Sequence, residues 1–564
     1  MNASTPISPA AAQSAAISTA TSPRWLWLIV LSIAVMWFAT LGPRRLLNPD
    51  EGRYAEIPRE MLVSGDWVTP RLNGIKYFEK PPLQYWMTAV AYQVFGENEF
   101  AARFWAGFTG FAGILLAGWT SARLFNRAAG AMAAVITASS LLYLAIGHIN
   151  TLDMSLSFFL ELTVCSFLLA QHSAPRSSAE RNWMLLAWAA AALAFLTKGL
   201  VALVLPSLTL LAYTVLTREF SAWKRLHIVK GLALFLLLAL PWVIAAARAN
   251  PEFLSFFFLH EQFARFLVNS HDRDGPIWYF LPLFVLGTLP WTFVALRQFN
   301  ATWRFDAQTN GLQMRRFLLV WIAVVIGFFS VSHSKLPPYI VPVMPMFAMV
   351  LGDVFTRLPA RTLRMHLLVI GLGLGALGLA VSLLPVTIAG AKNAALVADL
   401  RPETAIGFLL AAVAMLASNH MSGHKPIEVV VIVAGLGTLL GLSVLIKGTD
   451  ALDNTRSGYP LAGPIAAQLT PDTKLFSIGD YDQTLPFYLK RQITLVDYRG
   501  ELDFGLSQEP ELAIDSMQAF VPVWRNQAKA IAVMPPALYK ELLNQQLPMQ
   551  LITEQRKLVA VSKP

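Results

Sequence analysis

Acidic and basic side chains crowd the stretch NPDEGRYAEIPREML, residues 48–62, which directly follows an apolar segment. Charge of this density beside a hydrophobic run serves one of two purposes. The basic residues either pair with carboxylates on short helices at a membrane surface, with Tyr54, Ile57, Met61 and Leu62 as the apolar face, or they bind an anionic phosphate. Both purposes can hold at once. The charged residues of this part of the chain include Arg44, Arg45, Arg53, Arg59, Arg71, Lys76 and Lys80, with Glu51, Glu56, Glu60 and Asp66 as acids.

More ionisable residues stand at the ends of later apolar runs. A carboxylate there can act as a general base or orient a cation, and a lysine can bind phosphate. The structural alternatives are a helix cap for an aspartate and, for a lysine, a helix end from which the ammonium reaches the membrane surface. The candidates are Asp50, Glu79, Lys80, Asp153, Lys198 and Lys335.

Five residues offer side chains that zinc accepts as ligands, namely Glu79, His260, Glu261, His271 and Asp272. Their spacing is not diagnostic, so a divalent metal is expected from residue types alone, and a structural role for His260 is an equal alternative. Cys165 is the single cysteine and lies in an apolar run. A disulfide framework and a thiolate metal site are therefore both excluded.

The elements that must position these residues are membrane helices. The chain has 564 residues, of which 55% are hydrophobic and 14% charged, a composition far from that of soluble proteins. A span takes about 20 mostly apolar residues. The sequence LTKGL around Lys198 is either a tight turn between two spans or the middle of one bent element. Thirteen candidate spans lie near 25–42, 100–121, 128–147, 153–171, 183–197, 199–217, 228–248, 278–297, 315–333, 338–356, 366–388, 404–419 and 427–446.

Lysine and arginine gather in alternate loops, for example at Arg123 and Arg127 and at Arg361 and Arg364, which predicts that these loops face the cytoplasm. An odd number of spans then places the N-terminus inside and the tail outside. Residues 1–22 lack charge and predict a disordered lead before an uncleaved first anchor. The net charge of +10 reflects this asymmetry and does not indicate nucleic acid.

After about residue 447 the hydropathy falls and short β-type runs alternate with helical ones. KLFSIG, QITLVDY, AKAIAVM, LPMQLITE and KLVAVS predict strands, and DQTLPFYLK and PALYKELLNQQ predict helices. The domain plan is a lead at 1–22, a membrane domain at 23–447 with outer loops at 43–99 and 249–277, and an α/β domain at 448–564. No catalytic motif is visible in the last of these.

A series of motifs occurs in order along the membrane part: PDEGRYAEIPREML, YFEKPPLQYW, TLD, LTKG, FFFLHEQFARF, WYFLPL and SKLPPYI. In these motifs the chain resembles the bacterial lipid A 4-amino-4-deoxy-L-arabinose transferases, which belong with the protein mannosyltransferases and oligosaccharyltransferases of GT-C type. The α/β domain resembles theirs only in placement. The chain departs from the family at two positions. In the family a histidine often follows the glutamate of the FFFLHEQFARF segment, whereas here His260 precedes that glutamate. Gly52 replaces the usual threonine and is expected to loosen the loop near Asp50.

The resemblance implies a polytopic α-helical GT-C glycosyltransferase that transfers aminoarabinose from undecaprenyl phosphate to lipid A phosphates at the periplasmic face of the inner membrane, giving polymyxin resistance. The alternatives are a related enzyme with another sugar or acceptor and, more remotely, a transporter of lipid-linked sugars. Membrane lipids surround the protein in each case. The implied catalytic residues are Asp50, Asp153, Glu79 and Lys80; the donor-phosphate residues Arg53, Lys80, Arg265, Tyr77 and Tyr339; the acceptor residues Lys198 and Lys335; and the zinc ligands Glu79 and His260, with His271 and Asp272.

Overall fold

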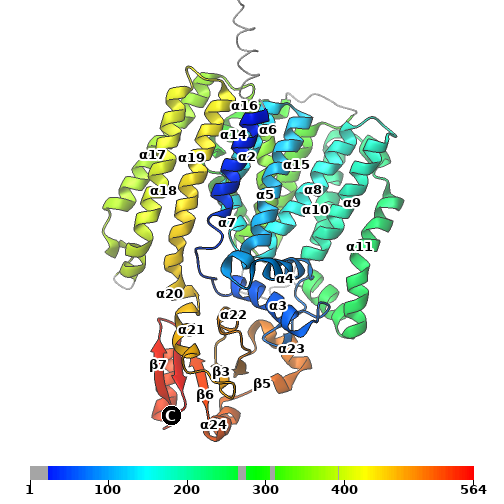
Figure 1. Cartoon of the computed structure of the whole chain (residues 1–564). Coiled ribbons are helices and arrows are strands. Elements are labelled where there is room, and N and C mark those ends of the chain that lie inside the picture. The colour runs from blue at the N-terminus through cyan, green and yellow to red at the C-terminus, as the bar shows by residue number, and fades with distance from the viewer. Residues whose placement is uncertain (1–22, 265–274, 305–310, 391–392) are drawn as a thin grey trace, which may run out of the picture.

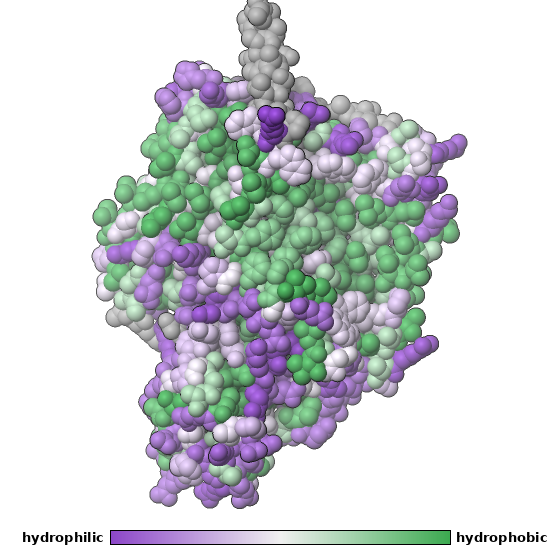
Figure 2. Space-filling view, in the orientation of Figure 1, coloured by the Kyte–Doolittle hydropathy of each residue, from purple (hydrophilic) through white to green (hydrophobic). Residues whose placement is uncertain are grey.

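A bundle of long helices carries a smaller α/β domain at one end in the computed structural model (Figure 1). The structure describes residues 23–264, 275–304, 311–390 and 393–564. An apolar band crosses the bundle between a hydrophilic rim at its N-terminal end and the hydrophilic α/β domain (Figure 2). The bundle consists of α2 (Pro23–Phe38), α5 (Glu99–Leu124), α6 (Arg127–Ala138), α7 (Leu141–Gly147), α8 (Leu152–His172), α9 (Ser178–Lys198), α10 (Val201–Thr217), α11 (Ile228–Ala249), α13 (Phe280–Gly287), α14 (Thr292–Arg304), α15 (Met314–Val331), η3 (Pro337–Val343), α16 (Met344–Phe355), α17 (Ala360–Leu383), α18 (Ala394–Met421) and α19 (Ile427–Gly448).

Every predicted span falls on one or two of these helices, but the number of crossings is not confirmed. Among the described residues, eight helices are long and apolar enough to cross a membrane, or up to ten if each bent pair counts as one span. The bent pairs are α6 with α7, at 63°, and α13 with α14, at 110°. The predicted segments near 25–42, 183–197 and 199–217 fall on α2, α9 and α10, which are not among the ten. The chain is therefore a multi-pass membrane protein.

The sequence around Lys198 forms a tight turn between two separate helices. α9 ends at Lys198, and Gly199 follows with φ of 85°. Only glycine adopts such a left-handed conformation without steric cost. α10 begins two residues later, so the turn fixes Lys198 at the end of the bundle.

We call the end of the bundle that carries the α/β domain the domain side, and the other end the opposite side. Arg45, after α2, contacts Glu99 at the start of α5 at 2.8 Å, and the Leu46 N–H donates to the Tyr488 hydroxyl of the domain at 2.8 Å. α2 therefore ends, and α5 begins, at the domain side. α8 also begins there and α9 ends there, which places Asp153 and Lys198 at the same boundary.

The first long connection lies between the bundle and the domain. It contains α3 (Asp50–Ser64), the strands β1 (Arg71–Leu72) and β2 (Ile75–Lys76), and α4 (Leu83–Phe95). Asn73 and Gly74 join the two strands, both with positive φ, which is the favoured two-residue hairpin turn. Gly65, with φ of 74°, ends α3.

The α/β domain holds a six-stranded sheet in the order β5-β4-β3-β6-β8-β7. The first four strands are parallel, β8 is antiparallel to β6, and β7 is antiparallel to β8. The predicted strands and helices occur at the predicted places. The elements are α21 (Tyr459–Ala466), β3 (Lys474–Ile478), α22 (Leu485–Leu489), β4 (Thr494–Val496), α23 (Asp503–Gln508), β5 (Ala513–Ile514), α24 (Met517–Asn526), β6 (Ala530–Met534), α25 (Pro536–Asn544), β7 (Gln550–Glu554) and β8 (Val559–Ser562).

The apolar face of α3 packs against the α/β domain, so its expected contact with lipid was wrong. Tyr54, Ile57 and Met61 are buried in one cluster with Tyr481 and Leu495 of the domain. The expectation for Gly52 was also wrong, because this residue lies inside α3 and does not loosen a loop. A Cβ at Gly52 would lie 2.4 Å from the Gln483 carbonyl carbon, so the missing side chain lets the domain backbone approach α3.

Candidate functional site

Buried ion pairs hold α3 at the membrane boundary. Glu51 accepts a hydrogen bond from Arg103 of α5 at 2.6 Å and another from the Asn150 N–H at 2.9 Å, and all three residues are fully buried. A buried carboxylate requires partners of this kind, because desolvation otherwise disfavours its charge. The network fixes Asp50, the neighbour of Glu51, relative to the chain that leads into α8 and Asp153. Sequence reasoning missed Arg103, although an arginine inside an apolar run was a signal for it.

Arg53 is the centre of the site on the α3 side. Its guanidinium lies 2.5 Å from the Asp50 carboxylate, donates to the Tyr77 hydroxyl at 2.8 Å and forms an ion pair with Glu501. The side chain of Arg53 is only 7% exposed, whereas that of Asp50 is 52% exposed. Asp50 is the first residue of α3, with no capping hydrogen bond, so the structure does not support its alternative role as a helix cap. Asp50 therefore orients Arg53 and still faces solvent.

Glu501 belongs to the α/β domain, and sequence reasoning did not select it. Parallel sheets of α/β domains bind ligands at the carboxyl ends of their strands, and here the loops after β3 and β4 carry Gln483 and Glu501 to Arg53. Gln483 donates to the Glu501 carboxylate at 2.6 Å. Burial, more than any other cause, raises the pKa of Glu501, while Arg53 opposes the shift. The domain therefore supplies one carboxylate of the site.

Lys80 lies between two carboxylates. Its ammonium is 3.1 Å from Glu261 and 3.7 Å from Glu79, and it donates to the Glu79 carbonyl at 2.7 Å. Glu261 lies in η2 (Ser255–Ala264), and Lys76 pairs with Glu252 at 2.8 Å just before this segment. Two ion pairs thus join the second outer loop to the first. Glu79 and Lys80, each predicted for the site, are neighbours here, and a phosphate that enters the site can replace a carboxylate as the partner of the lysine.

Asp153 and Lys198, predicted for different roles, form one ion pair. Asp153 lies in the first turn of α8, where no side chain caps the helix, so a capping role is not supported. The Lys198 ammonium also lies over the Tyr339 ring, 4.4 Å from its centroid. Lys335 is buried and donates to the Ser332 carbonyl at 2.6 Å. Of the two predicted acceptor lysines, Lys198 therefore lies against the candidate acid, and Lys335 contacts its own turn.

Three buried tyrosines lie among these charges. Burial raises the pKa of Tyr54 and of Tyr77 well above the usual value. The charges of Asp50 and Asp153 add to the rise in the pKa of Tyr54, after burial. The Tyr85 ring stacks on Tyr54 at 5.8 Å, and its buried hydroxyl has no hydrogen-bond partner among the residues that the structure describes. Hydroxyls held protonated in this way can donate to a phosphate or a sugar.

The metal expectation finds no complete site in the part of the chain that is described. Within those ranges, no three histidine, cysteine, aspartate or glutamate residues come together as metal ligands. The His260 ring is exposed and stacks on Phe256 at 5.2 Å, and Glu261 rather than His260 faces Lys80. Arg265, His271 and Asp272 lie outside the described residues. The described ligands alone do not fit zinc, which stays a prediction.

The site thus combines a carboxylate that faces solvent, cations that can neutralise phosphate, and phenol hydroxyls, all at one membrane boundary. Such a set can bind a lipid-linked phosphate and stabilise the charge that develops on a phosphate leaving group.

Two family models match this chain, and a solved structure shares its fold. Residues 22–257 match the family described as dolichyl-phosphate-mannose-protein mannosyltransferase, and residues 461–563 match the aminoarabinose transferase C-terminal domain. The second match shows that the resemblance of the α/β domain goes beyond placement, contrary to the expectation from sequence. An oligosaccharyltransferase from Archaeoglobus fulgidus, 11% identical with a TM-score of 0.51, shares only the fold.

Closer relatives share the sequence as well. An undecaprenyl phosphate-α-4-amino-4-deoxy-L-arabinose arabinosyl transferase of Sodalis glossinidius is 36% identical over 58% of each chain, so the match spans less than two thirds of that relative. One from Pseudomonas fluorescens is 31% identical over 86% of this chain and 88% of its own. The crystal structure of ArnT from Cupriavidus metallidurans bound to undecaprenyl phosphate is 34% identical, with a TM-score of 0.90 over 96% of this chain and 98% of that one. The chain therefore belongs to the undecaprenyl phosphate-aminoarabinose arabinosyl transferase family, with the GT-C fold.

Proposed function

We propose that the protein transfers 4-amino-4-deoxy-L-arabinose from undecaprenyl phosphate to a phosphate of lipid A. Its main support is that three ion pairs lie at the domain side of a membrane bundle that belongs to this family: Asp50 with Arg53, Lys80 with Glu261, and Asp153 with Lys198. Added aminoarabinose lowers the negative charge of lipid A. The enzyme then protects the cell against cationic peptides such as polymyxin.

The reaction exchanges one glycosyl phosphate for another. An oxygen of the acceptor phosphate attacks the anomeric carbon of the sugar, and the bond from that carbon to the polyprenyl phosphate oxygen breaks. The electron pair of that bond stays on the leaving phosphate, which becomes a monoester with one more negative charge. Lys80 and Arg53 are the cations assigned to this charge, and Tyr77 adds a hydroxyl donor.

Asp50 has no proton to remove if the acceptor is already ionised. A phosphate monoester has a second pKa near 6, so it is mostly a dianion at neutral pH. The Asp50 carboxylate lies 2.5 Å from the Arg53 guanidinium. We therefore assign Asp50 the role of orienting Arg53 or binding the ammonium group of the sugar, rather than that of a general base.

The proposed location is the bacterial inner membrane, with the active site in the periplasm. Basic residues follow the positive-inside rule on the opposite side of the bundle. Arg123 lies in the last turn of α5 and Arg127 begins α6. Lys224 lies in η1 (Ser221–Arg225), between α10 and α11, and Lys230 lies in the first turn of α11. This asymmetry turns the opposite side to the cytoplasm and the α/β domain outward.

The decisive experiment is the mass of lipid A from cells that make the protein and from cells that lack its gene. We expect an added aminoarabinose only in the first. Purified protein in liposomes, with undecaprenyl phosphate-aminoarabinose as donor, must give the same product. If lipid A is unchanged while another acceptor gains a sugar from a polyprenyl phosphate, the substrates are wrong and the reaction class stands.

A further inference from the structure

Three buried polar side chains connect α4 with the start of α8. Gln84, in the first turn of α4, is 1% exposed, and Asn150 and Ser155 are fully buried. The Gln84 amide donates to the Asn150 side-chain oxygen at 3.3 Å, and its own oxygen accepts from the Ser155 hydroxyl at 2.6 Å. A buried amide costs free energy unless both of its ends find partners. We call these three side chains the Gln84 bridge.

The two ends of this bridge lie next to the carboxylates of the site. On one side the Asn150 N–H donates to Glu51 at 2.9 Å, and Glu51 is the neighbour of Asp50 in α3. On the other side Ser155 lies two residues after Asp153, at the start of α8. The bridge therefore connects the segment that carries Asp50 with the turn that carries Asp153.

The start of α8 is held from two sides. Thr151 is the N-cap residue and makes no side-chain capping hydrogen bond, although the first N–H groups of a helix need such partners. The ion pair of Asp153 with Lys198 holds the turn from α9. Residues two apart on a helix point about 200° away from each other, so Ser155 faces the side away from this ion pair. The Gln84 bridge therefore holds α8 where the ion pair does not.

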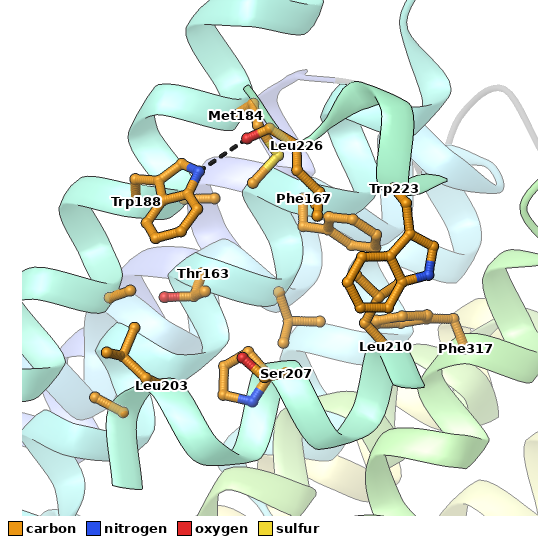
Figure 3. Close-up of a pocket in the computed structure, with 15 residues that line it drawn as sticks. Thr163, Phe167, Met184, Trp188, Leu203, Ser207, Leu210, Trp223, Leu226 and Phe317 are labelled. Atoms are coloured by element: carbon orange, nitrogen blue, oxygen red, sulfur yellow. Dashed lines mark hydrogen bonds between the residues drawn. The ribbon is translucent and has the colours of Figure 1, made fainter. Parts of the chain in front are cut away.

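Apolar contacts hold α8 as well, but they do not set its rotation. Farther along the helix, Phe167 lines an apolar cavity together with Trp188 of α9 (Figure 3). Near the site, Leu152 packs in one buried cluster with Tyr54 of α3. Such contacts are not directional, whereas a hydrogen bond weakens steeply as its angle departs from linear. The hydrogen bonds of the Gln84 bridge therefore fix how the first turn of α8 is rotated relative to α3.

We propose that Gln84 is a positioning residue of the transfer reaction, which sets Asp153 relative to Asp50. The inference rests on the proposed function, since both aspartates belong to the site of that reaction. Gln84 acts through Asn150 and Ser155 and takes no chemical step itself. A displacement of about 1 Å in a reacting group can lower a rate about a hundredfold, so loss of the bridge reaches the reaction through geometry. The cations assigned to the phosphate have partners outside the bridge, so donor binding is retained.

Gln84→Met tests the bridge, because methionine keeps the length of the side chain and removes both hydrogen-bonding groups. We expect kcat for aminoarabinose transfer to fall about tenfold, with the KM for the undecaprenyl phosphate donor within about twofold of wild type. Ser155→Ala breaks one of the two bonds and should lower kcat about threefold. The double variant should be no slower than Gln84→Met alone, because both substitutions break one connection. A wild-type kcat in Gln84→Met, a loss confined to KM, or losses that multiply would each overturn the proposal.

Tyr92→Phe is the matched control. Tyr92 is also buried on α4, and its hydroxyl donates to the Ala55 carbonyl of α3 at 3.1 Å. The substitution therefore removes one buried hydrogen bond of the same helix, but the partner lies on α3 rather than α8. We expect kcat to stay at the wild-type value even where the unfolding temperature falls. An equal loss of kcat in Tyr92→Phe contradicts the proposal, because it shows a general effect of packing around α4.

Hydrogen exchange separates failure of this inference from failure of the proposed function. Exchange at the backbone amides of residues 152–156, followed by mass spectrometry, reports the order of the first turn of α8 without any substrate. It should be faster in Gln84→Met than in wild type and unchanged in Tyr92→Phe; if Gln84→Met does not fold, Ser155→Ala takes its place. Equal exchange in variant and wild type overturns the inference whatever the reaction is. Faster exchange in a protein that transfers no aminoarabinose leaves the bridge as the device that places the two aspartates and refutes the proposed function instead.

Discussion

Glu60, near the end of α3, is expected to make the stability of the protein depend on pH. Its side chain is 7% exposed, and its carboxylate accepts a hydrogen bond from the Gly74 N–H at 2.8 Å. Glu56 lies beside it and accepts two hydrogen bonds from Arg59, which oppose the rise that burial causes in the pKa of Glu56. Burial first, and the charge of Glu56 second, raise the pKa of Glu60 from 4.5 to about 8.

The sign of the effect follows from proton binding. Below a pH of about 4.5, Glu60 is protonated in both the folded and the unfolded chain, and its contribution to stability is fully present. Between pH 4.5 and 8 only the unfolded chain releases the proton, so the free energy of unfolding falls by about 1.4 kcal/mol for each pH unit. The loss reaches roughly 5 kcal/mol at the folded pKa of about 8. Above that pH both states are ionised and the loss levels off.

Glu60→Gln removes this dependence, because glutamine does not ionise in either state. Relative to wild type, the variant should gain about 3 kcal/mol in the free energy of unfolding between pH 5.5 and 7.5, and the gain should level off above pH 8. The assay is unfolding in detergent, followed at matched heating rates across this pH range. Glu511→Gln is the control, since Glu511 and Glu60 line one pocket between α3 and the α/β domain, but Glu511 is exposed. A stability difference that is the same at every pH would refute the reasoning.

The remaining predictions concern transfer itself. Lys80→Ala should abolish transfer while the protein still elutes as a folded particle, because it removes the cation assigned to the leaving phosphate; an active variant would exclude that role. Glu79→Gln should lower the zinc bound per chain, and chelation should lower the rate, whereas full activity of metal-free protein contradicts this. Asp50→Asn should raise the free-energy barrier of transfer by about 2–4 kcal/mol at every pH between 5.5 and 8, as expected for lost orientation of Arg53; a defect that disappears above pH 6 would show instead that Asp50 acts as a general base. Tyr85→Phe should lower kcat/KM about tenfold, because it removes a buried hydroxyl that lacks a described partner, and an unchanged rate would show that the hydroxyl does not meet substrate.

The sequence predicted the features that depend on local pattern. The apolar segments are helical, the strands of the α/β domain lie where β-type runs occur, and Asp50 contacts Arg53 because residues three apart share a helix face. The ion pair between Asp153 and Lys198 was within reach of prediction, since Asp153 lies at the start of α8 and Lys198 at the end of α9, at the same membrane boundary.

Contacts between distant segments were beyond local pattern. Glu501 follows Arg53 by more than four hundred residues and lies in a loop without a motif, so nothing in its neighbourhood signalled the ion pair. The apolar face of α3 fitted a lipid surface and a protein surface equally well from composition. Gly52 was misread for the same reason, because its role depends on the Gln483 backbone that approaches it. Burial by a separate domain is a tertiary fact that periodicity does not encode.

The contact of Glu501 with Arg53 has a consequence for biosynthesis. A ribosome releases the chain from the N-terminus, and domains generally fold in that order. The membrane helices and Asp50 are therefore made long before Glu501 exists, and Arg53 lacks one of its carboxylate partners until the α/β domain has been made and has folded. The site is completed only when the whole chain has been made, so a prematurely terminated product would occupy the membrane without a finished donor site.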